Sequence, residues 1–71
     1  GGTAPAVLNG ANEEAVHSFL NCRIPFLDIE VMVRSALSSI PNQLHPSLRQ
    51  IQAADSYARM FVKKKIERRG L

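Results

Sequence analysis

The chain has 71 residues, a hydrophobic content of 45%, a charged content of 21% and a net charge of +3. This length allows one small domain, which buries only about 60% of its unfolded surface and has marginal stability alone. The composition excludes a disordered protein, and the single cysteine, Cys22, excludes an internal disulfide. No signal peptide and no membrane-spanning apolar run of ~20 residues is recognisable. The start at Gly-Gly suggests a piece excised from a longer protein.

The first predicted helix begins at Thr3, a good N-cap residue, with Pro5 in the first turn, where its missing N–H costs nothing. Apolar residues then follow at the i, i+3, i+4, i+7 spacing of an amphipathic helix. They are Ala4, Val7, Leu8, Ala11, Ala15 and Phe19, with Val16 and Leu20 at the side. The opposite, polar face is expected to carry Gly10, Glu13, Glu14 and His17. Gly10 should weaken the helix by about 1 kcal/mol relative to alanine.

Two asparagines interrupt the apolar stripe of this helix. Asn12 lies inside the stripe and Asn9 lies at its edge. A buried amide has donors and an acceptor to satisfy, and leaving it unpaired costs about 1–3 kcal/mol. We therefore predict that Asn12 is buried and hydrogen-bonds to backbone groups of a neighbouring loop or helix end. A contact with a ligand is the alternative.

The second predicted helix starts at Asp28 as its N-cap, with Leu27 and Met32 in the two positions of a hydrophobic staple. It ends before Pro41, because the residue that precedes a proline avoids the α region. Its apolar stripe consists of Ile29, Met32, Val33, Ala36, Leu37 and Ile40.

Two links join the predicted helices, at residues 21–27 and 41–46. In the first link, Ile24 and Phe26 are apolar and are expected to point inward. The second link combines two prolines with polar residues, which is typical of a bend. Its histidine, His45, is expected to be an ordinary loop residue.

The third predicted helix begins with a capping box, formed by Ser47 at the cap and Gln50 three residues later. Its apolar stripe consists of Leu48, Ile51, Ala54, Ala58, Phe61, Val62 and Ile66. Asp55 with the following serine also fits a second N-cap, which would divide this segment into two helices. The stripe keeps its phase across that point and favours one continuous or merely kinked helix. Gly70 is expected at the C′ position after the helix.

The end of the chain is basic, since residues 63–69 carry five cations and one acid. We expect a solvated last turn whose cations face the negative end of the helix dipole. A surface for nucleic acid or an acidic membrane is the alternative. The histidines show no ligand spacing with Cys22, and no catalytic set, phosphate loop or strand is recognisable. No catalytic, cofactor-binding or metal-binding residue is therefore predicted.

Four blocks of the sequence resemble the 1-deoxy-D-xylulose 5-phosphate reductoisomerase family, in the right order and over nearly the whole chain. The opening stretch, residues 1–13, is similar to the family's GGTAPAVLNAANE. The second block is AV and FL within residues 15–20, the third is RIPFLDI at 23–29, and the fourth joins PSL at 46–48 with AADSYAR at 53–59. Three residues depart from the pattern. Gly10 replaces a usual alanine, Glu14 stands at an often apolar or small position, and Tyr57 replaces a frequent tryptophan.

The resemblance implies an all-α fold, a small helical bundle of three to four helices. Residues 1–71 would form an incomplete C-terminal domain, without the preceding helix and the upstream NADPH-binding and catalytic domains. The family's enzymes convert 1-deoxy-D-xylulose 5-phosphate to 2-C-methyl-D-erythritol 4-phosphate in non-mevalonate isoprenoid biosynthesis. They use NADPH and Mg²⁺ or Mn²⁺, neither of which is expected to bind to this segment. Its role would be structural and non-catalytic.

The implied partners are the remainder of the reductoisomerase chain and, in the full-length enzyme, a second copy in a homodimer. No nucleic acid or membrane partner is expected, and the implied location is the bacterial cytoplasm or a plastid-type organelle. The structural candidates are Asn9, Asn12, Asp28 and Asp55. The residues of which some should face the missing parts are Val7, Leu8, Phe19, Leu37 and Phe61. The alternative function is a small helical interaction module that binds an acidic partner through its basic C-terminal end.

Overall fold

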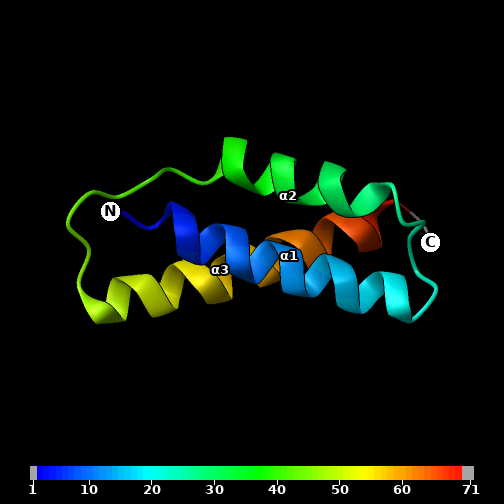
Figure 1. The fold of residues 1–71 in the computed structure, drawn as a ribbon, viewed down its shortest axis with the longest axis horizontal. Coiled ribbons are helices and arrows are strands. Elements are labelled where there is room, and N and C mark those ends of the chain that lie inside the picture. The colour runs from blue at the N-terminus through cyan, green and yellow to red at the C-terminus, as the bar shows by residue number, and fades with distance from the viewer. Residues whose placement is uncertain (1, 70–71) are drawn as a thin grey trace.

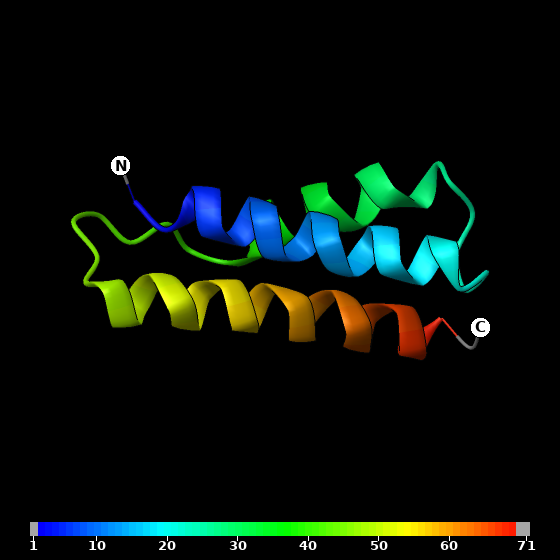
Figure 2. The same cartoon turned by 60° about the horizontal axis from the view of Figure 1, so that its bottom comes forward.

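The computed structural model describes residues 2–69. It contains three α-helices, α1 (Ala4–Leu20), α2 (Asp28–Ser39) and α3 (Leu48–Arg68), joined by two loops. Figures 1 and 2 show α1 and α3 running in the same direction, while α2 runs back against both. The bundle is elongated, with extents of 36 × 18 × 18 Å. The predicted all-α bundle is confirmed. The C′ position predicted for Gly70 lies outside the described residues.

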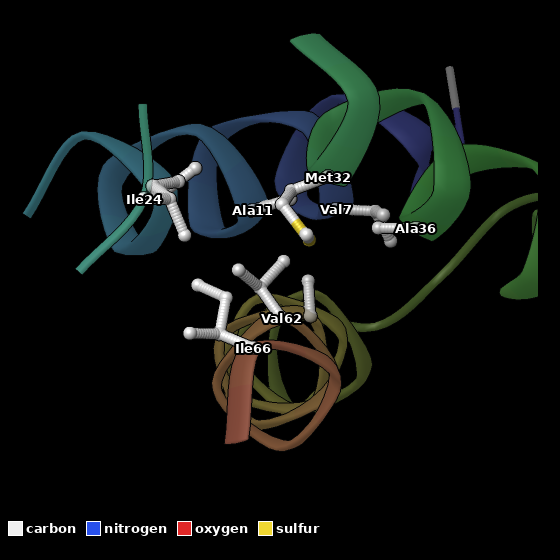
Figure 3. Close-up of a cluster of buried hydrophobic side chains, with 9 residues drawn as sticks. Val7, Ala11, Ile24, Met32, Ala36, Val62 and Ile66 are labelled. Carbon is white, nitrogen blue, oxygen red and sulfur yellow. The ribbon is translucent and has the colours of Figure 1, made fainter. Parts of the chain in front are cut away.

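Apolar side chains from all three helices meet in one core (Figure 3). Met32 reaches from α2 into the space between α1 and α3, close to Ala11 and Val62. The buried hydrophobic residues are Val7, Ala11, Ala15, Ile24, Met32, Ala36, Ala58, Val62 and Ile66. Several of them are alanines, which allow the helix backbones to approach closely. The larger phenylalanines, Phe19 and Phe61, pack only partly buried around this centre.

The start of α1 is closed by the loop before α3. Thr3 occupies the N-cap position, but its side chain makes no capping bond to its own helix. Its buried hydroxyl instead accepts a hydrogen bond of 2.9 Å from the Gln43 amide, and its own amide donates to the Gln43 carbonyl at 3.1 Å. Asn42 then caps the helix from a distance, since its Oδ1 accepts from the Ala4 amide at 2.9 Å. Thr3 is therefore the N-cap residue, as predicted, but the side-chain capping bond comes from Asn42 and not from Thr3.

The end of α1 has a Schellman motif with an unusual residue at its turning point. The Arg23 amide donates to the Ser18 carbonyl and the Cys22 amide donates to the Phe19 carbonyl, both at 2.9 Å. This pattern needs a left-handed residue at C′, and Cys22 adopts a φ of 61° there. The turn directs Ile24 into the core. Cys22 itself remains exposed.

The start of α2 differs from its prediction in three respects. Asp28 is the first helical residue and not the N-cap, a position that belongs to Leu27. The amide of Asp28 already has a partner in the Pro25 carbonyl at 3.0 Å, so the preceding turn replaces a side-chain cap. Leu27 is 79% exposed and does not form the predicted staple with the buried Met32. Phe26 is 65% exposed, although it was expected to point inward, and touches Phe19 edge to face.

The predictions for the end of α2 and the start of α3 are confirmed. Ile40, before Pro41, is extended with a ψ of 117°, and α2 has ended at Ser39. The capping box of α3 has both of its hydrogen bonds, since Ser47 Oγ accepts from the Gln50 amide and Gln50 Oε1 accepts from the Ser47 amide. Asp55 does not start a second helix, because α3 is continuous from Leu48 to Arg68.

Candidate functional site

The contact between α1 and α3 holds a polar network built from four side chains. Asn9 Nδ2 donates to Asp55 Oδ2 at 3.1 Å. Arg59 Nε donates to the other carboxylate oxygen, Asp55 Oδ1, at 2.6 Å, and a terminal nitrogen of Arg59 donates to Glu13 Oε1 at 2.7 Å. Two charged pairs and one amide therefore tie the middle of α1 to the middle of α3. This α1–α3 network unites Asn9 and Asp55, two of the predicted structural candidates.

Asp55 and Arg59 hold each other in their ionised forms. The Arg59 guanidinium beside Asp55 keeps the pKa of that carboxyl below its ordinary value, against a smaller opposing effect of burial. The same hydrogen bonds, to Asp55 first and then to Glu13, raise the pKa of Arg59. Neither group is set up to exchange a proton near neutral pH, so the network acts as a clamp between helices.

Sequence reasoning did not identify Glu13 and Arg59 as members of this network. Glu13 was assigned to a solvent-facing position, and its side chain is in fact 55% exposed. The pair of Asp55 and Arg59 could have been predicted from the sequence, because side chains four residues apart lie on the same side of a helix. No local signal joins Asn9 or Glu13 to a helix 46 residues away.

Gly10 lies where α3 packs directly against the backbone of α1, and it is buried. A Cβ atom added there would be 2.5 Å from the Asp55 carbonyl oxygen and 3.4 Å from the Ala58 Cβ. The assignment of Gly10 to the exposed polar face is therefore wrong. The glycine permits a backbone contact that a side chain would obstruct, and this contact aligns Asn9 and Glu13 with Asp55 and Arg59.

Asp28 joins α2 to the end of α3. Its Oδ2 accepts a hydrogen bond of 2.6 Å from an Arg69 guanidinium nitrogen, 41 residues later in the chain. The Asp28 side chain is largely buried and Arg69 is 41% exposed. Asp28 is thus a structural residue, but through this ion pair and not as the predicted helix cap. Arg68, the last residue of α3, also bonds within the chain, to the Lys64 carbonyl.

Asn12 is exposed, which contradicts its predicted burial against a neighbouring loop or helix end. It lines a surface groove of about 370 Å³ between α1 and α2, called here the α1–α2 groove. The other lining residues are Phe26, Leu27, Ile29, Glu30 and Val33. The apolar stripe of α1 is wider than the part of the helix surface that α2 and α3 bury. The side of the stripe that carries Asn12 therefore stays outside the core.

A second, more polar depression lies near the end of α1, with a volume of about 490 Å³. It is lined by Glu14, His17, Ser18, Asn21, Arg23, Lys63 and Ile66. His17 is exposed and its backbone carbonyl accepts a bond of 2.8 Å from Asn21 Nδ2, so this end of α1 is capped. His45 lies in the loop before α3, as predicted, and is exposed.

Within residues 2–69, no group of three or more histidine, cysteine, aspartate or glutamate side chains is placed to hold a metal ion. The residues that the structure describes also contain no helix with the length and hydropathy required to cross a membrane.

Comparison with known proteins gives a consistent result. Residues 1–61 match the family model described as DXP reductoisomerase C-terminal domain. The chain is 47% identical over 66 residues to 1-deoxy-D-xylulose 5-phosphate reductoisomerase of Heliobacterium modesticaldum, covering 93% of this chain and 17% of that protein. It is 47% identical over 70 residues to the protein of the same name from Parasynechococcus marenigrum, covering 96% and 17%. For Exiguobacterium sibiricum the identity is 52% over 62 residues, covering 87% and 16%. The chain thus spans about one-sixth of the length of these relatives.

Proposed function

Because the chain belongs to the family of DXP reductoisomerase C-terminal domains, we propose that it serves as the non-catalytic helical domain of a 1-deoxy-D-xylulose 5-phosphate reductoisomerase. The parent enzyme would convert 1-deoxy-D-xylulose 5-phosphate to 2-C-methyl-D-erythritol 4-phosphate in isoprenoid biosynthesis. The observation that carries this proposal is the match of residues 1–61, supported by relatives that are about six times longer.

The interhelical polar side chains described above bond to one another within the bundle. Asn9, Asp55 and Arg59 bind one another between α1 and α3, and Asp28 binds Arg69 between α2 and the end of α3. Within residues 2–69, no three histidine, cysteine, aspartate or glutamate side chains come together where they could hold a metal ion. We propose that the Mg²⁺ or Mn²⁺, the NADPH and the substrate bind to the other domains of the parent enzyme.

The proposed role of this domain is to support the fold of the remainder of the parent chain. Several large apolar side chains remain at the surface, among them Leu8, Leu37 and Phe26. Exposed apolar area on a small domain indicates contact with another part of a protein. Of the residues expected to face missing parts, Leu8 and Leu37 fit this role, whereas Val7 is buried in the core. A helix before residue 1 would cover part of this surface.

From the family membership we also propose that the parent enzyme is located in the bacterial cytoplasm or a plastid-type organelle. We propose further that it forms a homodimer. The alternative of a basic interaction module is not favoured. The family match identifies a reductoisomerase domain, and at least one cation of the basic end, Arg69, is used within the bundle to bind Asp28.

The test is made on the full-length gene product. We expect the full-length protein to oxidise NADPH with 1-deoxy-D-xylulose 5-phosphate and Mg²⁺ or Mn²⁺. The Arg59→Ala variant should lower the melting temperature and leave kcat and KM unchanged at a temperature where the protein is folded. Turnover by residues 1–71 alone, or a coding sequence that starts immediately before residue 1, would refute the proposal.

A further inference from the structure

The polar depression at the end of α1 contains two cations that form no ion pair in the bundle. Arg23, from the turn after α1, and Lys63, from α3, line it together with the carboxylate of Glu14. Within residues 2–69, none of these three side chains belongs to an ion pair. By contrast, Arg59 and Arg69 each bind a carboxylate of another helix. The depression therefore keeps two cations and one carboxylate available to a ligand.

A buried hydroxyl opens into the same depression. Ser18 is only 5% exposed and is one of the lining residues. Its hydroxyl takes part in none of the side-chain hydrogen bonds found in residues 2–69. No fully enclosed side-chain oxygen or nitrogen of these residues lacks a partner, so the Ser18 hydroxyl must be reachable from the depression. The buried hydroxyl of Thr3, in comparison, is bonded to the chain.

Local and tertiary structure together hold these groups in place. The bond of 2.9 Å from the Arg23 amide to the Ser18 carbonyl fixes the turn after α1 against the end of the helix. Ile24, the next residue, is buried in the core and anchors the turn from inside. Lys63 reaches the depression because the end of α1 lies beside the last turns of α3 (Figures 1 and 2). The three donors thus come from a helix, a turn and a second helix around one space.

These donors suit a phosphate group. A guanidinium presents several N–H groups in one plane, and an ammonium presents three that rotate. Together with the Ser18 hydroxyl they approach from different elements of the fold. Such an arrangement matches the tetrahedral oxygens of a phosphate better than the two coplanar oxygens of a carboxylate. Hydrogen bonds between charged partners are also the stronger class.

The remainder of the depression is larger than a phosphate group requires. Its volume of about 490 Å³ lies within the range of about 300–1,000 Å³ that is typical of small-molecule sites. Glu14 would repel a bare phosphate dianion, but its carboxylate can accept a hydrogen bond from a hydroxyl group of the ligand. Asn21 also lines the depression, and its amide nitrogen is already bonded to the His17 carbonyl, so its oxygen remains as an acceptor. These acceptors favour a ligand that carries hydroxyl groups beside its phosphate.

We propose that this depression binds a small phosphomonoester whose carbon chain bears hydroxyl groups. The phosphate lies between Arg23, Lys63 and Ser18, and a hydroxyl group of the ligand donates to Glu14. The inference concerns side chains that the packing of the helices does not use, and it does not depend on the proposed function.

The test measures hydrogen exchange in the full-length protein with glycerol 3-phosphate, which has one phosphate and two hydroxyl groups. The amides of residues 18–24 report on the site, because those of Cys22 and Arg23 bond within the turn. Glycerol 3-phosphate should slow their exchange at a lower concentration than inorganic phosphate, and sodium chloride of equal ionic strength should have no effect. No slowing by glycerol 3-phosphate, or equal slowing by chloride, would overturn the proposal. Equal potency of inorganic phosphate would overturn the hydroxyl contact.

Three variants test the phosphate contacts with the same readout. Arg23→Gln and Lys63→Gln should each weaken the binding of glycerol 3-phosphate at least about tenfold, as expected for a hydrogen bond to a charged group. Ser18→Ala should weaken it about fivefold, as for an ordinary hydrogen bond. Lys64→Gln is the matched control and should bind as the parent does, because Lys64 neighbours Lys63 on α3 but does not line the depression. Equal losses in Lys63→Gln and Lys64→Gln would indicate a general attraction by positive charge and overturn the site.

Discussion

Against α3, α1 presents Gly10 together with the amide and carboxylate side chains of Asn9 and Glu13, whereas beside α2 it borders the α1–α2 groove, which is open and lined mainly by apolar side chains. In the contact between α1 and α3, the polar side chains hydrogen-bond to one another within this chain. Ala11 and Ala15 are buried in the core that all three helices share, whereas Leu8 remains exposed. The comparison shows that α1 forms a fully paired polar contact with α3, whereas its side next to α2 keeps an open apolar groove to which another segment could bind.

The largest effect is expected from a change that weakens both contacts at once. Met32 is fully buried and reaches between α1 and α3 (Figure 3). Met32→Ala should lower the free energy of unfolding of the domain by about 2–5 kcal/mol, because the cavity touches all three helices. Hydrogen exchange of the α1 amides in the full-length enzyme measures this loss. Val31→Ala, on the exposed side of α2, is the control. It should lower the free energy of unfolding by less than a quarter of the loss in Met32→Ala. Equal losses would show that the core has been assigned wrongly.

A change at Gly10 acts on the α1–α3 contact alone. Gly10→Val should destabilise the domain by about 1–3 kcal/mol through overpacking, since its Cβ would meet the backbone oxygen of Asp55 at 2.5 Å. His17→Ala, on the exposed side of the same helix, should change the stability by less than about 0.5 kcal/mol. Thermal unfolding of the full-length protein compares the two. A Gly10→Val variant as stable as the parent would mean that α1 and α3 separate at no cost.

The loop that closes the start of α1 offers a smaller effect. Asn42→Ala removes the acceptor of the Ala4 amide and should cost about 1 kcal/mol, the usual effect of losing an N-cap. Exchange of the first amides of α1 should accelerate, while those of α3 stay protected. Gln52→Ala, an exposed change on α3, is the control. Uniform acceleration along α1 and α3 would contradict a local capping role.

The smallest effect is expected from the charges of the α1–α3 network. Asp55 is 26% exposed and Arg59 is 37% exposed, so solvent screens their attraction. Asp55→Asn should cost at most about 1 kcal/mol at pH 7. The folded-state pKa of Asp55 is lowered, so its stabilisation is complete above the ordinary pKa of 3.8 and disappears as the pH falls through the lower, folded value.

Chemical unfolding at several pH values checks this charge effect. The difference in unfolding free energy between the parent and Asp55→Asn should shrink below about pH 4, because Asp55 of the unfolded chain is protonated there and Asp55 of the folded chain follows at lower pH. Glu30→Gln, in the exposed pair with Arg34 on α2, is the control and should change stability by less than about 0.5 kcal/mol. A difference that grows on acidification would reverse the assigned sign.

The sequence by itself determined the helices and most of their ends. Apolar periodicity, the capping box at Ser47 and Gln50, and the stop before Pro41 are local signals, and each acts within a few residues of where it is found. The continuity of α3 through Asp55 also followed from the phase of its apolar stripe. The family resemblance was readable too, because its motifs are contiguous stretches of sequence.

Tertiary structure alone decided which side of α1 is buried and which residues pair across the bundle. The apolar stripe of α1 is wide enough for two orientations, and the close approach of α3 at Gly10 selects the one that exposes Asn12. Asn42 caps α1 from 38 residues away, and Arg69 binds Asp28 from 41 residues away. Such partners leave no periodic trace in the sequence, because they meet only after the helices have packed.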